Sequence, residues 1–208
     1  MRDGFAIRKG QAGDLETLYE ICLKTGDGGK DATSLYNHPE LIGQIYAAPY
    51  VALPGLISFV AEDREGIVGY AAGAVDTRAF ENRLELEWWP DLRKRYPDPG
   101  LERTNLSPDE SRAKTIHHPR PVPDDIVREY PAHIHMNLFE RARGKGVGSS
   151  LLDSWINAAR EQGVCAVHAG VSGANHSGLK FWTARGFKQV RVDLQNGSNG
   201  TIWTGRLI

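Results

Sequence analysis

A basic, glycine-rich segment from Arg143 to Ser149 separates two stretches of different hydrophobic period. Residues 132–139 alternate apolar and polar side chains, which predicts a strand. Residues 147–162 carry apolar side chains at helical spacing and predict an amphipathic helix. Glycines allow successive backbone amides to point in one direction, and the first amides of a helix have no partner within it. The order of strand, glycine loop and helix therefore predicts an α/β fold with an anion site, most naturally for a phosphate or pyrophosphate.

Three kinds of phosphate loop compete for this segment. The P-loop pattern needs a lysine directly before a serine or threonine, and Gly148-Ser149 does not supply it. The dinucleotide-binding pattern GxGxxG needs a leading βαβ unit, whereas this segment lies late in the chain. The pattern R/QxxGxG/A is matched by Arg143, Gly146 and Gly148. A glycine-rich turn with a basic surface and no ligand is the remaining interpretation.

With this pattern the chain resembles the GNAT superfamily of acyl-CoA-dependent N-acetyltransferases. A second segment of that family, N…(A/G)xxFYxxxGF, is similar to the residues from Asn175 to Phe187. The two segments occur in the order that the family has. The resemblance covers the whole chain apart from a long insertion, and it implies a mixed, mostly antiparallel central sheet flanked by helices. In such a sheet a splayed strand pair holds the cofactor.

A narrower resemblance is to the acetyltransferase-like domain attached to O-GlcNAc hydrolases. It is carried by residues 25–33 (TGDGGKDAT), 49–50 (PY) and 68–70 (VGY). In animals that domain is regarded as a pseudo-acetyltransferase. The phosphate loop of the present chain is intact, which favours cofactor binding.

The GNAT resemblance implies acetyl-CoA as a cosubstrate and indicates which residues would bind it. Backbone groups at the end of the strand would pair with the pantetheine arm, and one N–H would polarise the thioester carbonyl. The glycine loop would hold the pyrophosphate, and Asn175 would meet the pantetheine or the nearby backbone. The implied cofactor-binding residues are Leu138, Phe139, Arg143, Gly144, Lys145, Gly146, Val147, Gly148, Ser149, Asn175 and Trp182.

The family reaction is direct attack of an amine on the thioester, so a base must take the proton of the amine. His133 and His135 lie two residues apart on the expected strand and therefore share one face. This spacing resembles arylalkylamine N-acetyltransferases, whose paired histidines relay the proton; the alternative is that both histidines only pack against the insertion. Asp27 and Asp31 lie in the loop that borders the acceptor side in this family. They would bind a cationic amine or act as the base, and the alternative is a solvated loop.

Trp182 departs from the family pattern, because relatives often have a tyrosine there whose hydroxyl protonates the leaving thiolate. An indole N–H is too weak an acid for that role. Ser172 or a water molecule would replace it, or the thiolate would leave unprotonated, since thiol pKa values lie near about 8.5. The alternative is that Trp182 only packs in the core.

The chain is expected to form one acetyltransferase domain over residues 1–208, with a proline-rich insertion at about 77–131. Eight of the eleven prolines fall inside the insertion, so we expect one helix over residues 80–96 followed by irregular loop. Trp88 and Trp89 on that helix would pack the insertion, form a dimer contact or line a substrate site. The other expected strands lie at 5–9, 57–61, 67–75, 164–171, 189–194 and 201–207, and the other helices at 14–24, 34–47 and 177–184.

Charge and composition argue against some classes of binding partner. Lys and Arg number 25 and Asp and Glu 26, a net charge of −1, which argues against a nucleic-acid binder with a general basic surface. The N-terminus carries charges and no apolar core, and prolines and glycines interrupt the uncharged stretch 41–61. We therefore expect no signal peptide, no membrane contact and a cytoplasmic location. Cys22 and Cys165 are expected to be buried thiols.

The expected partners are acetyl-CoA and an amine acceptor, which is either a small molecule or a protein lysine. Members of the resembled family are often dimers, so a homodimer is also expected. We expect no metal, and a site formed by the two strand histidines with His117 and His118 is the weaker alternative. Two further hypotheses are a non-catalytic interaction module with the same fold and a nucleotide-binding domain of another kind.

Overall fold

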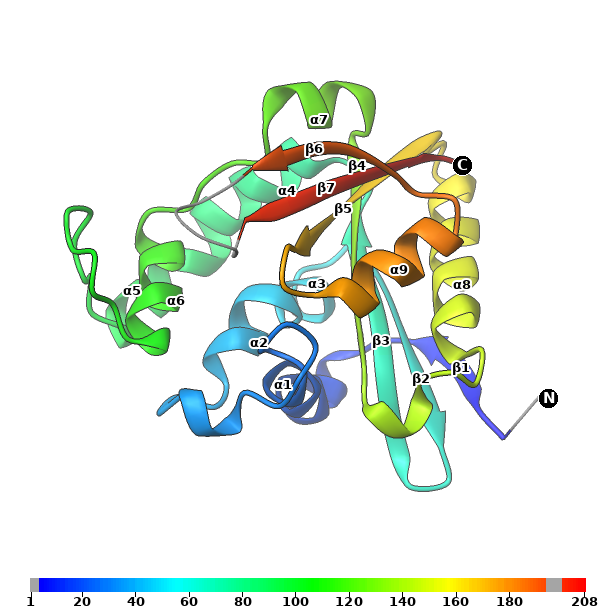
Figure 1. Cartoon of the computed structure of the whole chain (residues 1–208), viewed down its shortest axis with the longest axis horizontal. Coiled ribbons are helices and arrows are strands. Elements are labelled where there is room, and N and C mark those ends of the chain that lie inside the picture. Colours follow the sequence, from blue (N-terminus) through cyan, green and yellow to red (C-terminus); the bar gives the residue numbers. More distant parts are fainter. Residues whose placement is uncertain (1–3, 194–199) are drawn as a thin grey trace.

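The computed structural model describes residues 4–193 and 200–208. Seven strands form one sheet in the order β1-β2-β3-β4-β5-β7-β6 (Figure 1). Neighbouring strands are antiparallel except for β4 and β5, which are parallel. The predicted α/β class and mostly antiparallel sheet are confirmed. The strands are β1 (Ala6–Lys9), β2 (Ile57–Asp63), β3 (Gly66–Ala74), β4 (Ala132–Leu138), β5 (Ala166–Ser172), β6 (Lys188–Asp193) and β7 (Thr201–Leu207).

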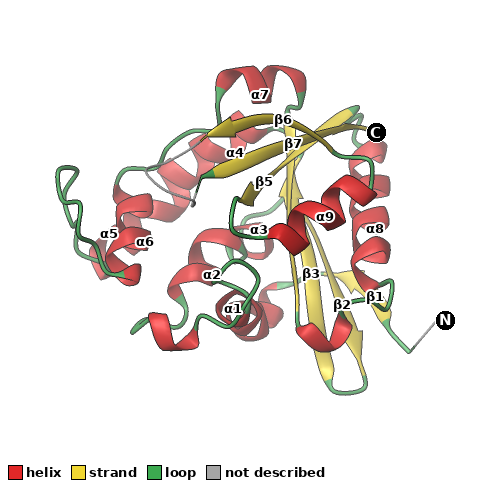
Figure 2. Ribbon diagram, in the orientation of Figure 1, coloured by secondary structure: helices red, strands yellow, loops and turns green. Residues whose placement is uncertain are grey.

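Helices cover both faces of this sheet (Figure 2). One core lies between the sheet and α1, α2, α4, α5 and α6, and the other lies between the sheet and α8 and α9. The helices are α1 (Leu15–Lys24), α2 (Leu41–Tyr46), α3 (Pro49–Ala52), α4 (Thr77–Arg83), α5 (Trp89–Arg95), α6 (Pro108–His117), α7 (Asp124–Glu129), α8 (Val147–Glu161) and α9 (His176–Ala184).

β3 lies near the centre of the sheet and is buried along most of its length. Its sequence, GIVGYAAGA, is therefore an almost unbroken run of small and apolar residues. At Gly73 a Cβ atom would lie 2.0 Å from the carbonyl oxygen of His133 and 2.9 Å from Cζ2 of Trp155. Only glycine allows β3, β4 and α8 to approach this closely.

β4 and β5 diverge soon after they begin. Their register pairs only Ala132–His133 with Val167–His168, although the strands continue to Leu138 and Ser172. On its other side β4 stays paired with β3 over its whole length beyond Ala132. The splayed strand pair implied by the family resemblance is thus present, and the C-terminal part of β4 has one edge without a strand partner.

The insertion differs from its prediction. Residues 77–95 form α4, a single π-helical turn (Leu84–Trp88) and α5, close to the expected helix. The expected irregular loop after it contains two more helices, α6 and α7. α6 begins with a capping box, in which the Ser107 side chain accepts from the Glu110 amide and the Glu110 carboxylate accepts from the Ser107 amide. This S-x-x-E pattern followed by helix formers is the signal that the prediction missed.

Smaller differences concern single elements. The second expected helix starts later, at Leu41 rather than residue 34. Trp89 is buried in the core that the insertion shares with α1 and α2. Trp88 donates from its indole to the carbonyl of Gln44 at 2.8 Å, which joins the insertion to α2. Cys22 is buried as expected, whereas Cys165 is exposed. The expected turn between β6 and β7 falls mostly on residues 194–199, which lie outside the described residues.

Candidate functional site

The free edge of β4 carries backbone groups that point toward β5. The Phe139 amide donates to the Val68 carbonyl at 2.8 Å. In an antiparallel pair the backbone groups of every second residue point to the partner strand, so those of the odd-numbered residues of β4 point toward β3. The amides and carbonyls of Met136 and Leu138 then face the divergent side. The backbone of Phe139 itself is already paired, since its carbonyl accepts from Ala142 at 3.0 Å. Of the two predicted pantetheine contacts, Leu138 lies on the free edge and Phe139 does not.

The glycine loop forms a cradle of amides at the start of α8. Gly144 and Gly146 have φ values of +73° and +80°, a conformation that L side chains rarely adopt. Gly146 is the N-cap of α8, and within the described residues none of the amides of residues 144–149 donates to a protein acceptor. Six consecutive free N–H groups at a helix N-terminus, where the helix dipole is positive, fit a phosphate or pyrophosphate.

Two other segments meet at this cradle. Arg143 donates through Nη2 to the carbonyl of Gly29 at 2.7 Å, which joins the cradle to the loop after α1. A Cβ atom at Gly29 would lie 3.3 Å from Oδ1 of Asn175, so the same loop also touches the start of α9. A Cβ atom at Gly148 would lie 3.2 Å from the Phe181 ring of α9. The glycines of the cradle thus serve both its amide geometry and the close packing of α8 against α9.

His133 is held by two hydrogen bonds inside the protein. The Thr77 hydroxyl donates to the Pro131 carbonyl at 2.7 Å, so it accepts from Nδ1 of His133 at 3.0 Å. The Tyr50 hydroxyl then donates to Nε2 at 2.8 Å. Burial, followed by the nearby His168 and His135, lowers the pKa of His133 to about 3. A neutral imidazole with both nitrogens engaged matches the packing alternative better than the role of base.

His135 lies on the same face of β4 and is less constrained. Its partner is Asn137, whose Nδ2 lies 3.3 Å from Nε2. Its ring stacks on Tyr46 at a centroid distance of 5.7 Å, and burial lowers its pKa to about 4. The side chain is partly exposed and neutral above that pH. Within the described residues, both ring nitrogens of His133 are engaged, whereas His135 has a ring nitrogen that makes no short hydrogen bond.

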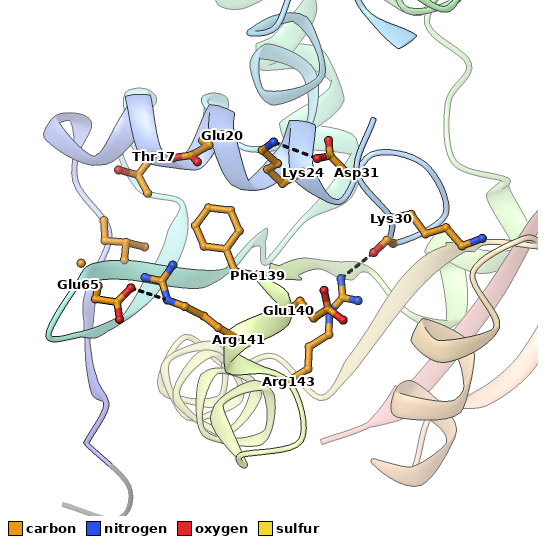
Figure 3. A pocket seen from close by; sticks show the side chains of 13 residues that line it. Thr17, Glu20, Lys24, Lys30, Asp31, Glu65, Phe139, Glu140, Arg141 and Arg143 are labelled. Atoms are coloured by element: carbon orange, nitrogen blue, oxygen red, sulfur yellow. Dashed lines mark hydrogen bonds and ion pairs between the residues drawn. The ribbon is translucent and has the colours of Figure 1, made fainter. Parts of the chain in front are cut away.

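A cavity of about 640 Å³ opens beside the cradle, between α1, the turn after β2 and the residues that follow β4 (Figure 3). Arg143, which directly precedes the cradle in the chain, lines this cavity. The walls of the cavity carry charges of both signs. They include the ion pairs of Lys24 with Asp31 at 2.9 Å and of Arg141 with Glu65 at 3.8 Å. The histidines of β4 do not line it, so the cavity is distinct from the face that carries them.

Comparisons with known proteins agree with this architecture. Residues 119–187, which include β4, the cradle and α9, match the model of the acetyltransferase (GNAT) family. The crystal structure of SsHAT is 32% identical, with 98% of each chain covered and a TM-score of 0.87. This chain belongs to the GNAT family. The structure of yncA from Salmonella typhimurium, a putative acetyltransferase with its cofactor acetyl-CoA, shares the GNAT fold at 16% identity, 99% and 94% coverage and a TM-score of 0.56.

Protein O-GlcNAcase from Rattus norvegicus is a more distant relative. It is 25% identical over 187 residues, which are 89% of this chain and 20% of the rat protein. The chain therefore spans about a fifth of the length of the curated relatives that it matches. This match supports the narrower resemblance to the acetyltransferase-like region of those proteins.

Two GNAT motif residues have structural contacts. Asn175 is the N-cap of α9, and its Oδ1 accepts from the Gly178 amide at 2.8 Å. Trp182 is 7% exposed and packs edge-to-face on Phe187, at a centroid distance of 4.7 Å. The indole is part of the core below α9, in agreement with the packing alternative. Ser172, the other suggested proton donor, is exposed at the end of β5, where its carbonyl accepts from the Asn175 amide.

The two aspartates predicted on the acceptor side of this GNAT domain are exposed. Asp31 accepts from the amide and hydroxyl of Thr33 and pairs with Lys24. These hydrogen bonds lower the pKa of Asp31 to about 2, so its carboxylate is a poor proton acceptor near neutral pH. The Asp27 amide and carbonyl pair with Lys30 to close the turn. Neither aspartate bonds to a histidine of β4.

One buried polar residue beside His133 was not singled out from the sequence. His168 of β5 is 1% exposed, and its ring lies 5.9 Å from that of His133. Its Nδ1 donates to the Tyr130 carbonyl at 2.7 Å, and burial lowers its pKa to about 4. A histidine within an otherwise apolar strand was the available signal. His117 and His118 bond instead to Tyr96 and Asp98, at the far end of α6.

No helix within residues 4–193 and 200–208 has the length and apolar character needed to cross a membrane.

Proposed function

We propose that the chain transfers the acetyl group of acetyl-CoA to an amine acceptor by direct attack of the amine on the thioester. The observation that carries this proposal is the position of the amide cradle at the end of the opening between β4 and β5. An extended pantetheine arm can pair with a free strand edge as another strand would, here with Met136 and Leu138. Its pyrophosphate would then reach the amides of residues 144–149.

The cradle supplies donors that need no side-chain charge. Its free N–H groups would bind the pyrophosphate, and Lys145 would add a mobile cation beside it. Arg143 would contribute less charge than the sequence suggests, because one arm of its guanidinium already holds the carbonyl of Gly29. The amide of Leu138 is the proposed donor that polarises the thioester carbonyl, since amides aimed at a developing oxyanion stabilise it.

His135 is the proposed proton acceptor. An amine attacks only in its free form, and its nitrogen becomes acidic once it is bonded to the carbonyl carbon. The neutral imidazole would take that proton directly or through a water molecule. Because burial lowers the pKa of His135 to about 4, its protonation would not limit the rate near neutral pH. The thiolate of CoA would leave without an acid from Trp182.

Calorimetric titration with acetyl-CoA tests the cofactor site, with CoA, ATP and NAD titrated separately as controls. We expect micromolar binding of acetyl-CoA and CoA, and no binding of ATP or NAD. Gly146→Asp places a carboxylate among the free amides and should weaken binding at least about tenfold. Gly163→Asp is the matched control, because Gly163 follows the C-terminus of the same helix with φ of +81° against +80° for Gly146. Equal binding by Gly146→Asp and the control would refute the assigned site.

A second candidate function is a non-catalytic module that binds acetyl-CoA or a protein. It is favoured by the tryptophan in place of a tyrosine at position 182 and by the low pKa of His135. Release of CoA thiol in the presence of primary amines separates the two functions. Turnover that His135→Ala abolishes, with acetyl-CoA binding unchanged, supports the enzyme. Binding without turnover for any amine supports the module.

A further inference from the structure

Arg112 on α6 differs from the other three partly buried arginines of the insertion. Arg78, Arg83 and Arg93 each pair with a carboxylate at 2.5–2.8 Å. Arg112 is partly buried, and within the described residues no carboxylate lies within 4.0 Å of it. A charge in a partly enclosed position is unfavourable unless an anion or strong acceptors compensate it. The environment of Arg112 is therefore incomplete in a way that the environments of its neighbours are not.

Two tyrosine hydroxyls hold the guanidinium. Nε donates to Tyr36 at 3.1 Å and Nη1 donates to Tyr46 at 2.9 Å. The Cζ atom also lies 5.4 Å from the centroid of the Tyr46 ring. A guanidinium has five N–H donors in a planar fork, so these contacts fix its orientation and leave donors free. The hydroxyl protons of both tyrosines also remain available, because each oxygen accepts from Arg112.

Tyr46 connects this group to the proposed base. Its ring stacks on His135 at 5.7 Å, with 24° between the ring planes. Arg112, Tyr46 and His135 thus form one row, and all three side chains are partly exposed. The row runs from the insertion to the face of β4 that would meet the acceptor.

We propose that Arg112, Tyr36 and Tyr46 bind a carboxylate of the acceptor, so that the substrate is an amine that also carries a carboxylate. This inference rests on the proposed acetyltransferase function. The planar fork of a fixed guanidinium matches the geometry of a carboxylate, and hydroxyl donors on either side complete the set of partners. The same substrate would present its amine to His135 on the other side of the Tyr46 ring.

The test uses ω-amino acids from glycine to 6-aminohexanoate as acceptors and the corresponding amino amides as matched controls. CoA release gives kcat/KM for each compound. The wild-type chain should prefer one or more amino acids over their amides. Arg112→Gln should lower kcat/KM for those amino acids at least about tenfold and leave the amides unchanged. Arg112→Lys keeps the charge without the fork and should fall between. Arg83→Gln, in the same insertion, should behave as wild type.

Two further measurements keep the outcomes distinct. Calorimetric titration with acetyl-CoA should give the same affinity for wild type and Arg112→Gln. A wild-type chain that does not bind acetyl-CoA would refute the proposed function, whatever the result at Arg112. Titration with the amino acids without acetyl-CoA, so that no turnover occurs, should show that the wild type binds them and that Arg112→Gln binds them more weakly. Thermal unfolding shows whether each variant is folded. A folded Arg112→Gln that treats acids and amides as the wild type does would overturn the carboxylate site and leave the acetyltransferase proposal standing.

Discussion

Three neutral histidines beneath the opening make the stability of this fold depend on pH. Burial is the main reason why the pKa of His133 falls to about 3 and those of His135 and His168 to about 4. In the unfolded chain all three return to about 6.5. Between these values the unfolded state binds more protons than the folded state. The free energy of unfolding therefore decreases as the pH falls through this window and is constant above it.

The size of the effect follows from these shifts. Each histidine gives a slope of up to about 1.4 kcal/mol per pH unit, so the three together give up to about 4 kcal/mol per unit below pH 6. His133 and His135 are partly exposed, which makes this figure an upper limit. Carboxylates such as Asp14 have lowered pKa values, so their contribution is lost mainly below this window. At pH 5 the integrated loss is at most about 6 kcal/mol, which is comparable with the low end of the stability of an ordinary domain, about 5–15 kcal/mol.

Urea unfolding followed by tryptophan fluorescence between about pH 7.5 and about pH 5 measures this slope. His168→Gln removes one buried titrating group and should reduce the slope by about a third. His176→Gln changes an exposed histidine on α9 and serves as the control, with the slope of the wild type. A free energy of unfolding that stays constant down to pH 5, or equal slopes in all three proteins, would refute the reasoning.

Three further predictions concern single residues. Gly73→Ala forces a Cβ atom to 2.0 Å from the backbone of β4 and should lower the free energy of unfolding by about 3 kcal/mol or prevent folding. Gly13→Ala is the control: no atom lies within 4 Å of a Cβ atom there, so the melting temperature should not fall. Cys165 is exposed and should react with a thiol reagent in the native state, whereas Cys22, buried with a pKa raised to about 12, should react only after unfolding; two fast thiols would contradict this. Asp31→Asn should change kcat/KM by less than about twofold, because the carboxylate is exposed and bonds only to the nearby Lys24 and Thr33 within the described residues. A large loss would restore Asp31 as a candidate base.

The cofactor side of the site could be predicted from the sequence because its signals are local. The glycine loop, the strand before it and the helix after it lie together between residues 132 and 162. Their order alone predicts free amides at a helix N-terminus. The divergence of β4 from β5 is not visible in the residues themselves, and it was anticipated only through the family resemblance.

The acceptor side could not be predicted in the same way. Alternation placed His133 and His135 on one face of β4, but it could not say which of them is engaged. That depends on Tyr50 and Thr77, which are 83 and 56 residues away from His133 in the chain. Arg112 was missed with α6, because the density of prolines outweighed the capping box at the start of that helix.

The insertion explains why these two sides of the site differ in predictability. Thr77, its first helical residue, donates from both its amide and its hydroxyl to the carbonyl of Pro131, directly before β4. The two ends of the insertion therefore meet at one point, and its internal structure can vary without changing the pairing of β3 with β4. The same threonine accepts from His133, and α6 carries Arg112 to Tyr46. In the proposed enzyme, a shared family loop would bind the cofactor and a separately variable insertion would select the acceptor. A family resemblance therefore indicates the cofactor site, whereas the acceptor site has to be found from the structure.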